Sequence, residues 1–301
     1  MVNYRCCQDP DPKPSRGTAI RLKKGRVVRN LLTCALAVLV IITSQLSADG
    51  APLPKVDHVV IIVEENRSLG EIAGNRHAPY INQLIKEGAL FTEAHAITHP
   101  SLPNYFALFA GALNTNGNGC PASGIAPNAP NLASELFASR RAFVGYAESM
   151  PHAGFLGCWA GKYARKHVPW VQFSNVPASA SLPFSALTSY DALPAATMII
   201  PNLDNDMHDG TIAMGDAWLE KHIAPLLAWG ATHATLFVLT WDEGFDPANH
   251  IPTVFVGPMV KPGRYSERVD HYTVLRTIED LLHLQPSGAA AKRTAISDCW
   301  R

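Results

Sequence analysis

The chain has 301 residues, of which 47% are hydrophobic and 17% are charged, and its 25 basic residues balance its 25 acidic ones. That is enough apolar material for a sizeable core, and one α/β domain of about 250 residues is common. Beyond residue 50 no stretch approaches the roughly 20 apolar residues of a membrane-spanning helix, and we find no internal repeat. The composition therefore favours a single globular domain.

The first 50 residues have the order of a secretory signal peptide. A basic stretch comes first, and it contains Arg16, Arg21, Lys23, Lys24, Arg26 and Arg29. An apolar run from Leu31 to Ile42 follows, and the small residues Ser47, Ala48 and Ala51 come after it. This order predicts a cleaved signal peptide, with an uncleaved N-terminal anchor as the alternative. We therefore expect a leader over residues 1–50, a folded domain over residues 52–301, and a secreted or extracytoplasmic protein.

The charge balance changes when this leader is left out. Residues 1–48 hold eight of the 25 basic residues and two of the 25 acidic ones, which leaves 17 basic and 23 acidic residues and a net charge near −6. An acidic domain gains no general attraction to nucleic acid or to anionic membranes. We expect no nucleic-acid partner and no stable membrane span after removal of the leader, and any phosphate binding has to be local.

Three cysteines lie in the predicted domain: Cys120, Cys158 and Cys299. An exported protein meets an oxidising compartment, so we expect a disulfide between Cys120 and Cys158, since both lie in Gly-, Pro- and Asn-rich segments that a crosslink would hold in place. Cys299 is then either free or available for pairing between chains.

The first half of the domain shows one buried strand and two helices. Residues 59–63 form a continuous β-branched run, as in a strand that is buried on both faces. Residues 79–86 have helical spacing and end before Gly88, and residues 89–97 form a second extended segment. Ser101 is well placed as the N-cap of a helix that continues to Gly111. Residues 114–130 are predicted to be loop.

In the second half, apolar β-like runs alternate with helical patterns. We expect a helix over 132–139, a strand over 142–146, a long excursion over 150–190, an apolar run over 198–200, a helix over 211–229, strands over 234–240 and 253–257, and a closing helix over 273–283. Alternation of this kind predicts an α/β domain with a mostly parallel sheet that is covered on both faces.

Polar residues follow several of these strands. They are Glu65 and Asn66 after the first strand, the cluster Asp204, Asp206, His208 and Asp209 after residues 198–200, Asp242 and Glu243 after the strand over 234–240, and His250 before the strand over 253–257. Ligands bind beyond the carboxyl ends of strands in open α/β sheets, and oxygen and imidazole groups suit divalent cations. The alternatives are turn chemistry at Asn66 and a solvated, Asp-rich loop at 204–209.

Ser101 is the candidate nucleophile, because the free N–H groups at a helix N-terminus stabilise an alkoxide or a phosphoryl group. His99 nearby is a candidate base or phosphate donor. The alternative for Ser101 is an ordinary N-cap serine, which contributes about 1 kcal/mol to its helix and nothing else.

The segment 161–167 is the only basic cluster in the acidic domain. It contains Lys162, Arg165 and His167, and such side chains can hold a phosphate group. The alternative is a solvated surface run.

Together, the segments HVVIIVEENRS, THPSLPNYFALFAG, GKYARKHVPWVQFSNV, IIPNLDNDMHDG, WDEG and IPTVFVGP resemble the phosphoesterase family of acid phosphatases and bacterial phospholipases C. They are most similar to its secreted mycobacterial members, which act on phosphatidylinositol 3-phosphate. The resemblance runs from about His58 to the C-terminus. It implies a catalytic domain over residues 52–301 with an alkaline-phosphatase-like fold, a three-layer α/β/α sandwich with metal at the carboxyl edge of its sheet.

The resemblance also implies roles for single residues. Glu65, Asn66, Asp242 and Glu243 become metal ligands, Ser101 the nucleophile that is transiently phosphorylated, and Lys162, Arg165, His167 and Asn104 the phosphate-binding set. His208 and His250 fall where relatives hold a second metal or protonate the leaving group, with Asp204 or Asp206 as the partner of His208, and His167 is a second candidate acid. Relatives with two metals usually have a histidine where this chain has Glu243. The sequence is therefore at least as consistent with one bound divalent ion as with two.

The function that follows is a secreted acid phosphatase that hydrolyses phosphate monoesters through a metal-activated serine and a phosphoserine intermediate. Phosphatidylinositol 3-phosphate is a candidate substrate, with its lipid head group as the partner. The first alternative is a phospholipase C-like phosphodiesterase on the same fold. A sulfatase is disfavoured because no Cys-x-Pro-Ser/Ala-x-Arg segment is present. A phosphoinositide-binding protein without catalysis is the remaining alternative.

Overall fold

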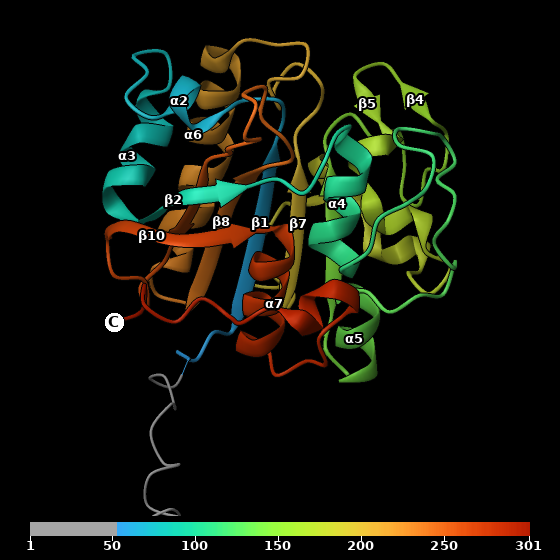
Figure 1. Ribbon diagram of the computed structural model, residues 1–301. Coiled ribbons are helices and arrows are strands. Elements are labelled where there is room, and N and C mark those ends of the chain that lie inside the picture. Colours follow the sequence, from blue (N-terminus) through green and yellow to red (C-terminus); the bar gives the residue numbers. More distant parts are fainter. Residues whose placement is uncertain (1–52) are drawn as a thin grey trace, which may run out of the picture. The chain divides into compact units, whose positions relative to one another are not determined.

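The computed structural model describes residues 53–301, and the predicted leader over residues 1–50 lies outside them. Their centre is an eight-stranded sheet in the order β10-β2-β9-β8-β1-β7-β3-β6 (Figure 1). The strands are β1 His58–Glu64, β2 Ala89–His95, β3 Phe143–Ala147, β6 Ser181–Pro183, β7 Ala196–Ile200, β8 Thr235–Trp241, β9 Thr253–Val256 and β10 Gly263–Asp270. All pairs are parallel except the two that β9 makes with β2 and β8, so the predicted, mostly parallel sheet is confirmed.

Helices cover both faces of this sheet. They are α2 Leu69–Ile72, α3 Pro79–Glu87, α4 Ser101–Ala110, α5 Leu132–Ala138, α6 Ile212–Gly230 and α7 His271–Leu281. In Figure 1, α4, α5 and α7 lie in front of the sheet, and α3 and α6 lie together on its other side. The arrangement is the predicted three-layer α/β/α sandwich.

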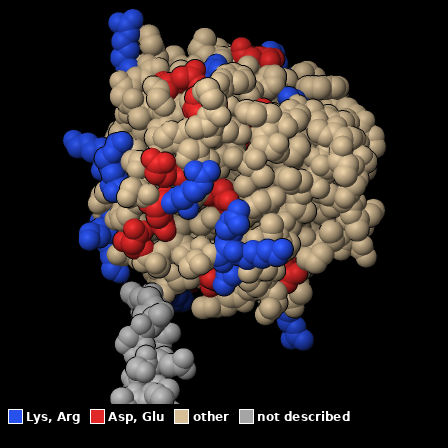
Figure 2. Space-filling model, in the orientation of Figure 1, with Lys and Arg blue, Asp and Glu red and all other residues tan. Residues whose placement is uncertain are grey.

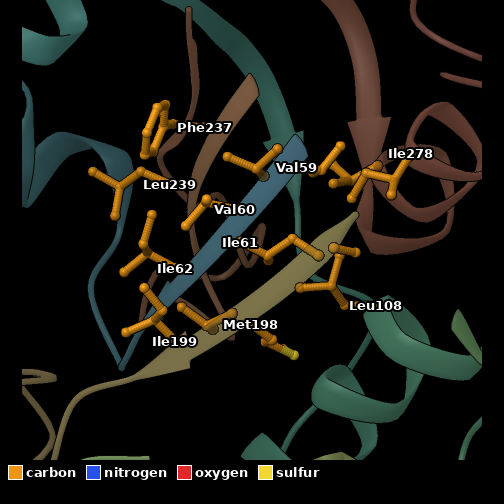
Figure 3. Close-up of a cluster of buried hydrophobic side chains, with 14 of the residues drawn as sticks. Val59, Val60, Ile61, Ile62, Leu108, Met198, Ile199, Phe237, Leu239 and Ile278 are labelled. Carbon is orange, nitrogen blue, oxygen red and sulfur yellow. The ribbon is translucent and has the colours of Figure 1, made fainter. Parts of the chain in front are cut away.

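The core lies on both faces of β1. Its run of β-branched residues is buried from Val59 to Val63, and consecutive side chains of a strand point to opposite faces. Figure 3 shows Ile61 on the side of Leu108 from α4 and Ile278 from α7, whereas Ile62 points to the opposite side. This double burial explains why β1 has no polar residue between its first position, His58, and its last, Glu64.

The long excursion between β3 and β7 carries little regular structure. Besides the edge strand β6, its elements are the two-stranded antiparallel pair β4 Trp159–Ala160 and β5 Tyr163–Ala164, and the short 3-10 helices η1 Arg165–His167, η2 Pro169–Gln172, η3 Ala178–Ala180 and η4 Phe184–Ala186. The predicted disulfide between Cys120 and Cys158 is present and joins the loop after α4 to the start of this excursion. Cys299 is buried and is the free cysteine of the described part.

Two local predictions need correction. Ser101 is not the N-cap of α4, because the extended residue Pro100 occupies that position and Ser101 is the first helical residue. The strand β10 was not predicted, because its alternation of exposed and partly buried residues, with charges such as Arg264 and Arg268, resembles a surface segment. It is an edge strand, for which such polarity is normal. None of the described helices has the length and apolar character that a membrane crossing requires.

Candidate active site

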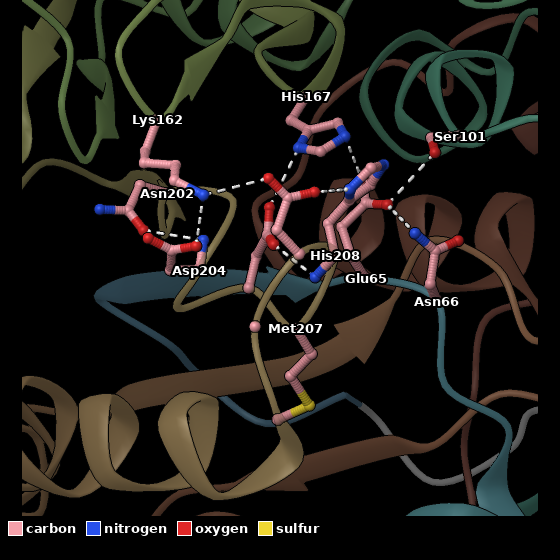
Figure 4. Close-up of polar contacts among 12 residues, drawn as sticks. Glu65, Asn66, Ser101, Lys162, His167, Asn202, Asp204, Met207 and His208 are labelled. Carbon is pink, nitrogen blue, oxygen red and sulfur yellow. Dashed lines mark hydrogen bonds and ion pairs between the residues drawn. The ribbon is translucent and has the colours of Figure 1, made fainter.

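Polar side chains from five segments meet at the carboxyl ends of the central strands (Figure 4). They are Glu65 and Asn66 after β1, His99 and Ser101 at the start of α4, Lys166 and His167 in η1, Asp206 and His208 after β7, and Asp242 and Glu243 after β8. The parallel order of β1, β7 and β8 brings these segments together, because their carboxyl ends lie at one edge of the sheet.

Ser101 lies buried between two carboxylates. Its Oγ is 3.2 Å from Oε2 of Glu65 and 3.3 Å from Oε1 of Glu243. Either oxygen can accept the hydroxyl proton, and the start of α4 adds the partial positive charge of a helix N-terminus. These are suitable surroundings for a nucleophilic oxygen.

Glu65 lies at the centre of the cluster and contacts both Ser101 and His167. Its Oε2 accepts from Nδ2 of Asn66 at 3.0 Å, its Oε1 accepts from the hydroxyl of Tyr105 at 2.8 Å, and Nε2 of His167 lies 2.8 Å from the same Oε1. Burial alone raises the pKa of Glu65, but the charge of His167 and these contacts outweigh it and bring the pKa to about 2. Glu65 is therefore an anion across the ordinary pH range.

His167 is held on both sides. Its Nδ1 lies 3.1 Å from Oδ2 of the fully buried Asp206, and its ring stacks on Tyr105 with the centroids 5.3 Å apart. Burial lowers the pKa of His167, whereas Glu65 and Asp206 raise it more strongly, to about 9. Asp206 thus orients this imidazole, as carboxylates commonly do behind ligand or catalytic histidines.

His208 lies at the more open side of the cluster. Its backbone N–H donates to Oδ1 of Asp206 at 2.8 Å, its Nε2 is 2.9 Å from Nζ of Lys166, and its Nδ1 is 2.8 Å from Oδ1 of Asp209. Lys166 is largely buried. Because an ammonium group has no acceptor, the Nε2 atom that faces it acts as the acceptor.

Asp242 and Glu243 add two more buried carboxylates. The N–H of Asn66 donates to Oδ1 of Asp242 at 3.1 Å, and Nδ1 of His99 lies 2.5 Å from Oε2 of Glu243. Burial, followed by repulsion from Glu65 and from Glu243, raises the pKa of Asp242 well above its ordinary value. Burial likewise raises the pKa of Glu243. Three carboxylates at such close quarters favour a bound cation.

The donor set fits a divalent metal ion. Oδ2 of Asp242 is buried without a hydrogen-bond partner, and Nε2 of His167 makes no hydrogen bond of normal geometry in spite of its nearness to Glu65. One ligand atom each from Glu65, His167 and His208 lies within 4.8 Å of the others. Mixed carboxylate and imidazole donors suit ions such as Zn²⁺ or Mn²⁺.

The structure brings most of the predicted site residues together, but it places four of them elsewhere. Nε2 of His250 donates to the carbonyl of Thr92 at 2.7 Å. The guanidinium of Arg165 donates to the carbonyl oxygens of Leu156 and Val171, and the Asn104 side chain bonds the backbone of residues 97 and 98. Asp204 accepts from Nζ of Lys162 at 2.6 Å at the surface. Local backbone bonds and an exposed ion pair therefore occupy these side chains, and Lys162 lies at the periphery of the site.

Two residues of the cluster, Tyr105 and Lys166, are not among the predicted site residues. Tyr105 follows Ser101 by four residues and so lies on the same face of α4, a spacing that marks it as a neighbour of the nucleophile. Lys166 precedes His167 in the basic segment, whose internal spacing alone does not tell which of its cations turns inward.

The phosphoesterase family model matches residues 74–285. The chain is 49% identical over 281 residues to the phosphatidylinositol-3-phosphatase of Mycobacterium tuberculosis, a match that covers 91% of this chain and 93% of that protein. It is 32% identical over 220 residues to the phosphate-repressible acid phosphatase of Penicillium chrysogenum, which covers 66% of this chain and 53% of the fungal protein. The chain thus spans nearly all of the first relative and about half of the second.

Solved structures share the fold at low sequence identity. A protein of the alkaline phosphatase superfamily from Vibrio parahaemolyticus has a TM-score of 0.59 at 12% identity, with 82% of this chain and 72% of that chain covered. The lipoteichoic acid synthase LtaP from Listeria monocytogenes has a TM-score of 0.59 at 10% identity, with 82% and 76% covered. At such identities the likeness concerns the fold.

Proposed function

Since the chain belongs to the phosphoesterase family and is a phosphatase, we propose that it is a secreted acid phosphatase in which Ser101 is the nucleophile that attacks phosphate monoesters. The observation that carries this proposal is the position of Ser101, buried at the start of α4 with its Oγ between Glu65 and Glu243. The disulfide between Cys120 and Cys158 supports an oxidising, extracytoplasmic compartment.

A divalent ion in this site would be held by Glu65, Asn66, Asp242 and Glu243, with His167 as a nitrogen donor beside them. The chemistry that such an ion supplies when bound is a lowered pKa of the serine hydroxyl and neutralisation of charge on the phosphate oxygens. Removal of the ion with a chelator should then abolish turnover, and added metal should restore it.

The protein's own side chains carry out the proton and phosphoryl transfers. Ser101 Oγ forms a bond to phosphorus as the bond between phosphorus and the leaving oxygen breaks. The hydroxyl proton of Ser101 passes to the carboxylate of Glu65 or Glu243, the two that lie within hydrogen-bond distance. In its protonated form, His208 gives a proton to the leaving oxygen, a role for which its half-open position suits it better than the enclosed His167. Water then cleaves the phosphoserine and releases phosphate.

Cationic side chains stabilise the charge of the transferred phosphoryl group. The helix N-terminus offers few free donors, because Pro103 has no N–H and the N–H of Leu102 donates to Oδ1 of Asn118 at 2.9 Å. Lys166, largely buried beside His208, is therefore the main cation for the equatorial phosphate oxygens. Lys162 lies farther out and is better placed for the rest of a substrate.

The mycobacterial relative is named as a phosphatidylinositol-3-phosphatase, which makes phosphatidylinositol 3-phosphate the first lipid substrate to test. Phosphate release from p-nitrophenyl phosphate, its bis-ester and this lipid should be measured between about pH 5 and pH 8, with and without chelator. Monoester turnover that needs metal supports the proposal. Release from the bis-ester alone would assign a phosphodiesterase, and no turnover with any metal would leave a binding protein.

Ser101→Ala tests the nucleophile. Without Oγ no phosphoserine forms, so turnover should fall by at least about a thousandfold while the thermal unfolding midpoint stays close to that of the wild type. The matched control is Ser174→Ala, which removes an exposed hydroxyl outside the cluster and should leave turnover unchanged. Normal turnover in the Ser101→Ala protein would contradict the assignment.

A further inference from the structure

Much of the surface beside the active site has no charged side chains. The segments 99–134, 149–161 and 168–190 contain no Lys, Arg, Asp or Glu. The structure joins them through the disulfide between Cys120 and Cys158, the bond from the N–H of Ser174 to the carbonyl of Pro127 at 2.6 Å, and the bond from Gly154 to Ser181. In Figure 2 the part of the visible face around α4 and the β4–β5 pair is accordingly almost free of blue and red. We call this surface the uncharged face.

Two large apolar side chains project from the uncharged face. Leu156 and Trp159 flank the disulfide cysteine Cys158, and each is 58% exposed. Leu156 also borders an apolar groove of about 320 Å³ that is lined by Pro127, Val171, Phe173 and Val176, among others. Exposed apolar groups in one contiguous patch mark interaction surfaces, whereas scattered ones need no explanation.

The same segment is built into the active site. The N–H of Leu203 donates to the carbonyl of Lys162 at 3.1 Å, which ties the β4–β5 turn to the loop that carries His208. Arg165 bonds back to the apolar segment through its N–H to the carbonyl of Cys158 and its guanidinium to the carbonyl of Leu156. Lys166 and His167 follow directly. Hydrogen bonds therefore tie the segment that carries Leu156 and Trp159 to the side chains of the candidate active site.

We propose that Leu156, Trp159 and the uncharged face around them dock onto the surface of a phospholipid bilayer, and so present a phosphomonoester on a lipid head group to Ser101. The inference rests on the proposed function, because it names the lipid class of substrate for the same site. Tryptophan prefers the interface of a bilayer, where its apolar body is buried and its N–H stays near water.

The charge distribution selects the lipid surface and the mode of docking. The domain outside the leader carries a net charge near −6, so its acidic surfaces are repelled by anionic membranes, whereas the uncharged face can approach them without this cost. Docking depends on inserted apolar side chains and not on attraction between charges. It should therefore occur on neutral phosphatidylcholine and persist in high salt, which screens surface charges.

The test compares vesicle-bound and soluble substrates. The purified protein is mixed with phosphatidylcholine vesicles, with and without phosphatidylinositol 3-phosphate, and bound protein is measured by sedimentation at low and high salt. Phosphate release is measured from the vesicles, from a short-chain soluble form of the same lipid, and from p-nitrophenyl phosphate. The variants are Leu156→Ser, Trp159→Ser, their combination, and Trp159→Phe as the conservative replacement.

The double variant should lose about tenfold or more in vesicle binding and in release from vesicles, because two apolar side chains no longer enter the bilayer. Its rates on the two soluble substrates should stay within about twofold of the wild type, and Trp159→Phe should restore most of the binding. The matched control is Phe245→Ser, which removes another exposed apolar side chain, 66% exposed but beside Asp246 and Glu71; it should bind like the wild type.

The outcomes separate this inference from the proposed function. Vesicle binding by the double variant that equals the wild type, or a wild type that does not bind vesicles, overturns the docking surface even if every soluble monoester is hydrolysed. Loss of vesicle binding in a protein that hydrolyses no soluble ester would retain the docking surface and overturn the phosphatase mechanism. An equal loss on soluble and vesicle substrates would show that the substitutions damage the active site, and it would also overturn the docking role.

Discussion

The hydroxyl of Tyr105 provides a sharp test of how the site is organised. It is fully buried and donates to Oε1 of Glu65 at 2.8 Å, while its ring stacks on His167. Tyr105→Phe keeps the ring and removes only this donor. A hydrogen bond to a charged group contributes about 1.5–3 kcal/mol, and groups that orient ligand residues affect metal affinity or activity by about tenfold to a hundredfold. We therefore expect a loss of that size in kcat or in apparent metal affinity.

The assay measures kcat and KM on p-nitrophenyl phosphate over a titration of the apo protein with a divalent metal, together with urea unfolding. The control is Tyr163→Phe, because the Tyr163 hydroxyl is also buried but has no hydrogen-bond partner. Its removal should leave activity unchanged and unfolding equal or slightly more difficult, since an unsatisfied polar group is lost. Equal behaviour of the two variants would refute the reasoning that Tyr105 positions Glu65.

Two further predictions concern stability. Replacement of both Cys120 and Cys158 by Ser should reduce the urea unfolding free energy by about 3–4 kcal/mol, because the disulfide closes a loop with a sequence separation of 38 residues. Cys299→Ser, at the free cysteine, is the control, and an equal loss in both proteins would contradict stabilisation by the disulfide. Burial raises the pKa of Glu279 to about 7, so the folded state loses stability as the pH rises from about 4.5, where the unfolded carboxyl ionises, to about 7. Glu279→Gln keeps an acceptor for the N–H of Ser287, and its unfolding free energy should rise by up to about 3 kcal/mol at pH 8 but little at pH 4. The exposed Glu87→Gln should gain no stability at either pH, and a gain for Glu279→Gln that does not depend on pH would refute the assignment.

The buried strands are predictable from the sequence, because continuous β-branched runs such as Val59–Val63 can only be covered on both faces. The end of α4 at Gly111 is predictable as well, since its φ of +61° is a conformation that glycine adopts without strain. The edge strand β10 is not predictable in this way. It pairs with a single neighbour, β2, and one of its sides is exposed, so its sequence has little hydrophobic pattern. Antiparallel β9 depends on where its partners lie, which no local pattern records.

The site residues divide in the same way. That acids would gather at the carboxyl edge follows from the alternation of strands and helices, and the structure does bring Glu65, Ser101 and Asp242 to one place. Which member of a polar cluster points inward depends on contacts that are distant in sequence. Arg165 and Asn104 carry suitable groups, yet nearby backbone carbonyls and N–H groups already occupy them, because buried backbone groups must also be satisfied.

The loop after β7 shows why spacing alone could not decide between Asp204 and Asp206. A strand would place both on one face, but the chain here turns, and Met207 adopts a φ of +74° that costs a non-glycine residue about 1–3 kcal/mol. This turn lets Asp206 accept from the N–H of His208 and bond His167, while Asp204 faces Lys162 at the surface. The strained conformation persists because the Met207 side chain is fully buried against α6, where Gly215 leaves room for it. Which of the two aspartates points into the site therefore depends on packing against α6, a helix that follows in the sequence. A methyl group at position 215 would collide with Met207, so Gly215→Ala should displace His208 and reduce turnover although residue 215 touches no substrate.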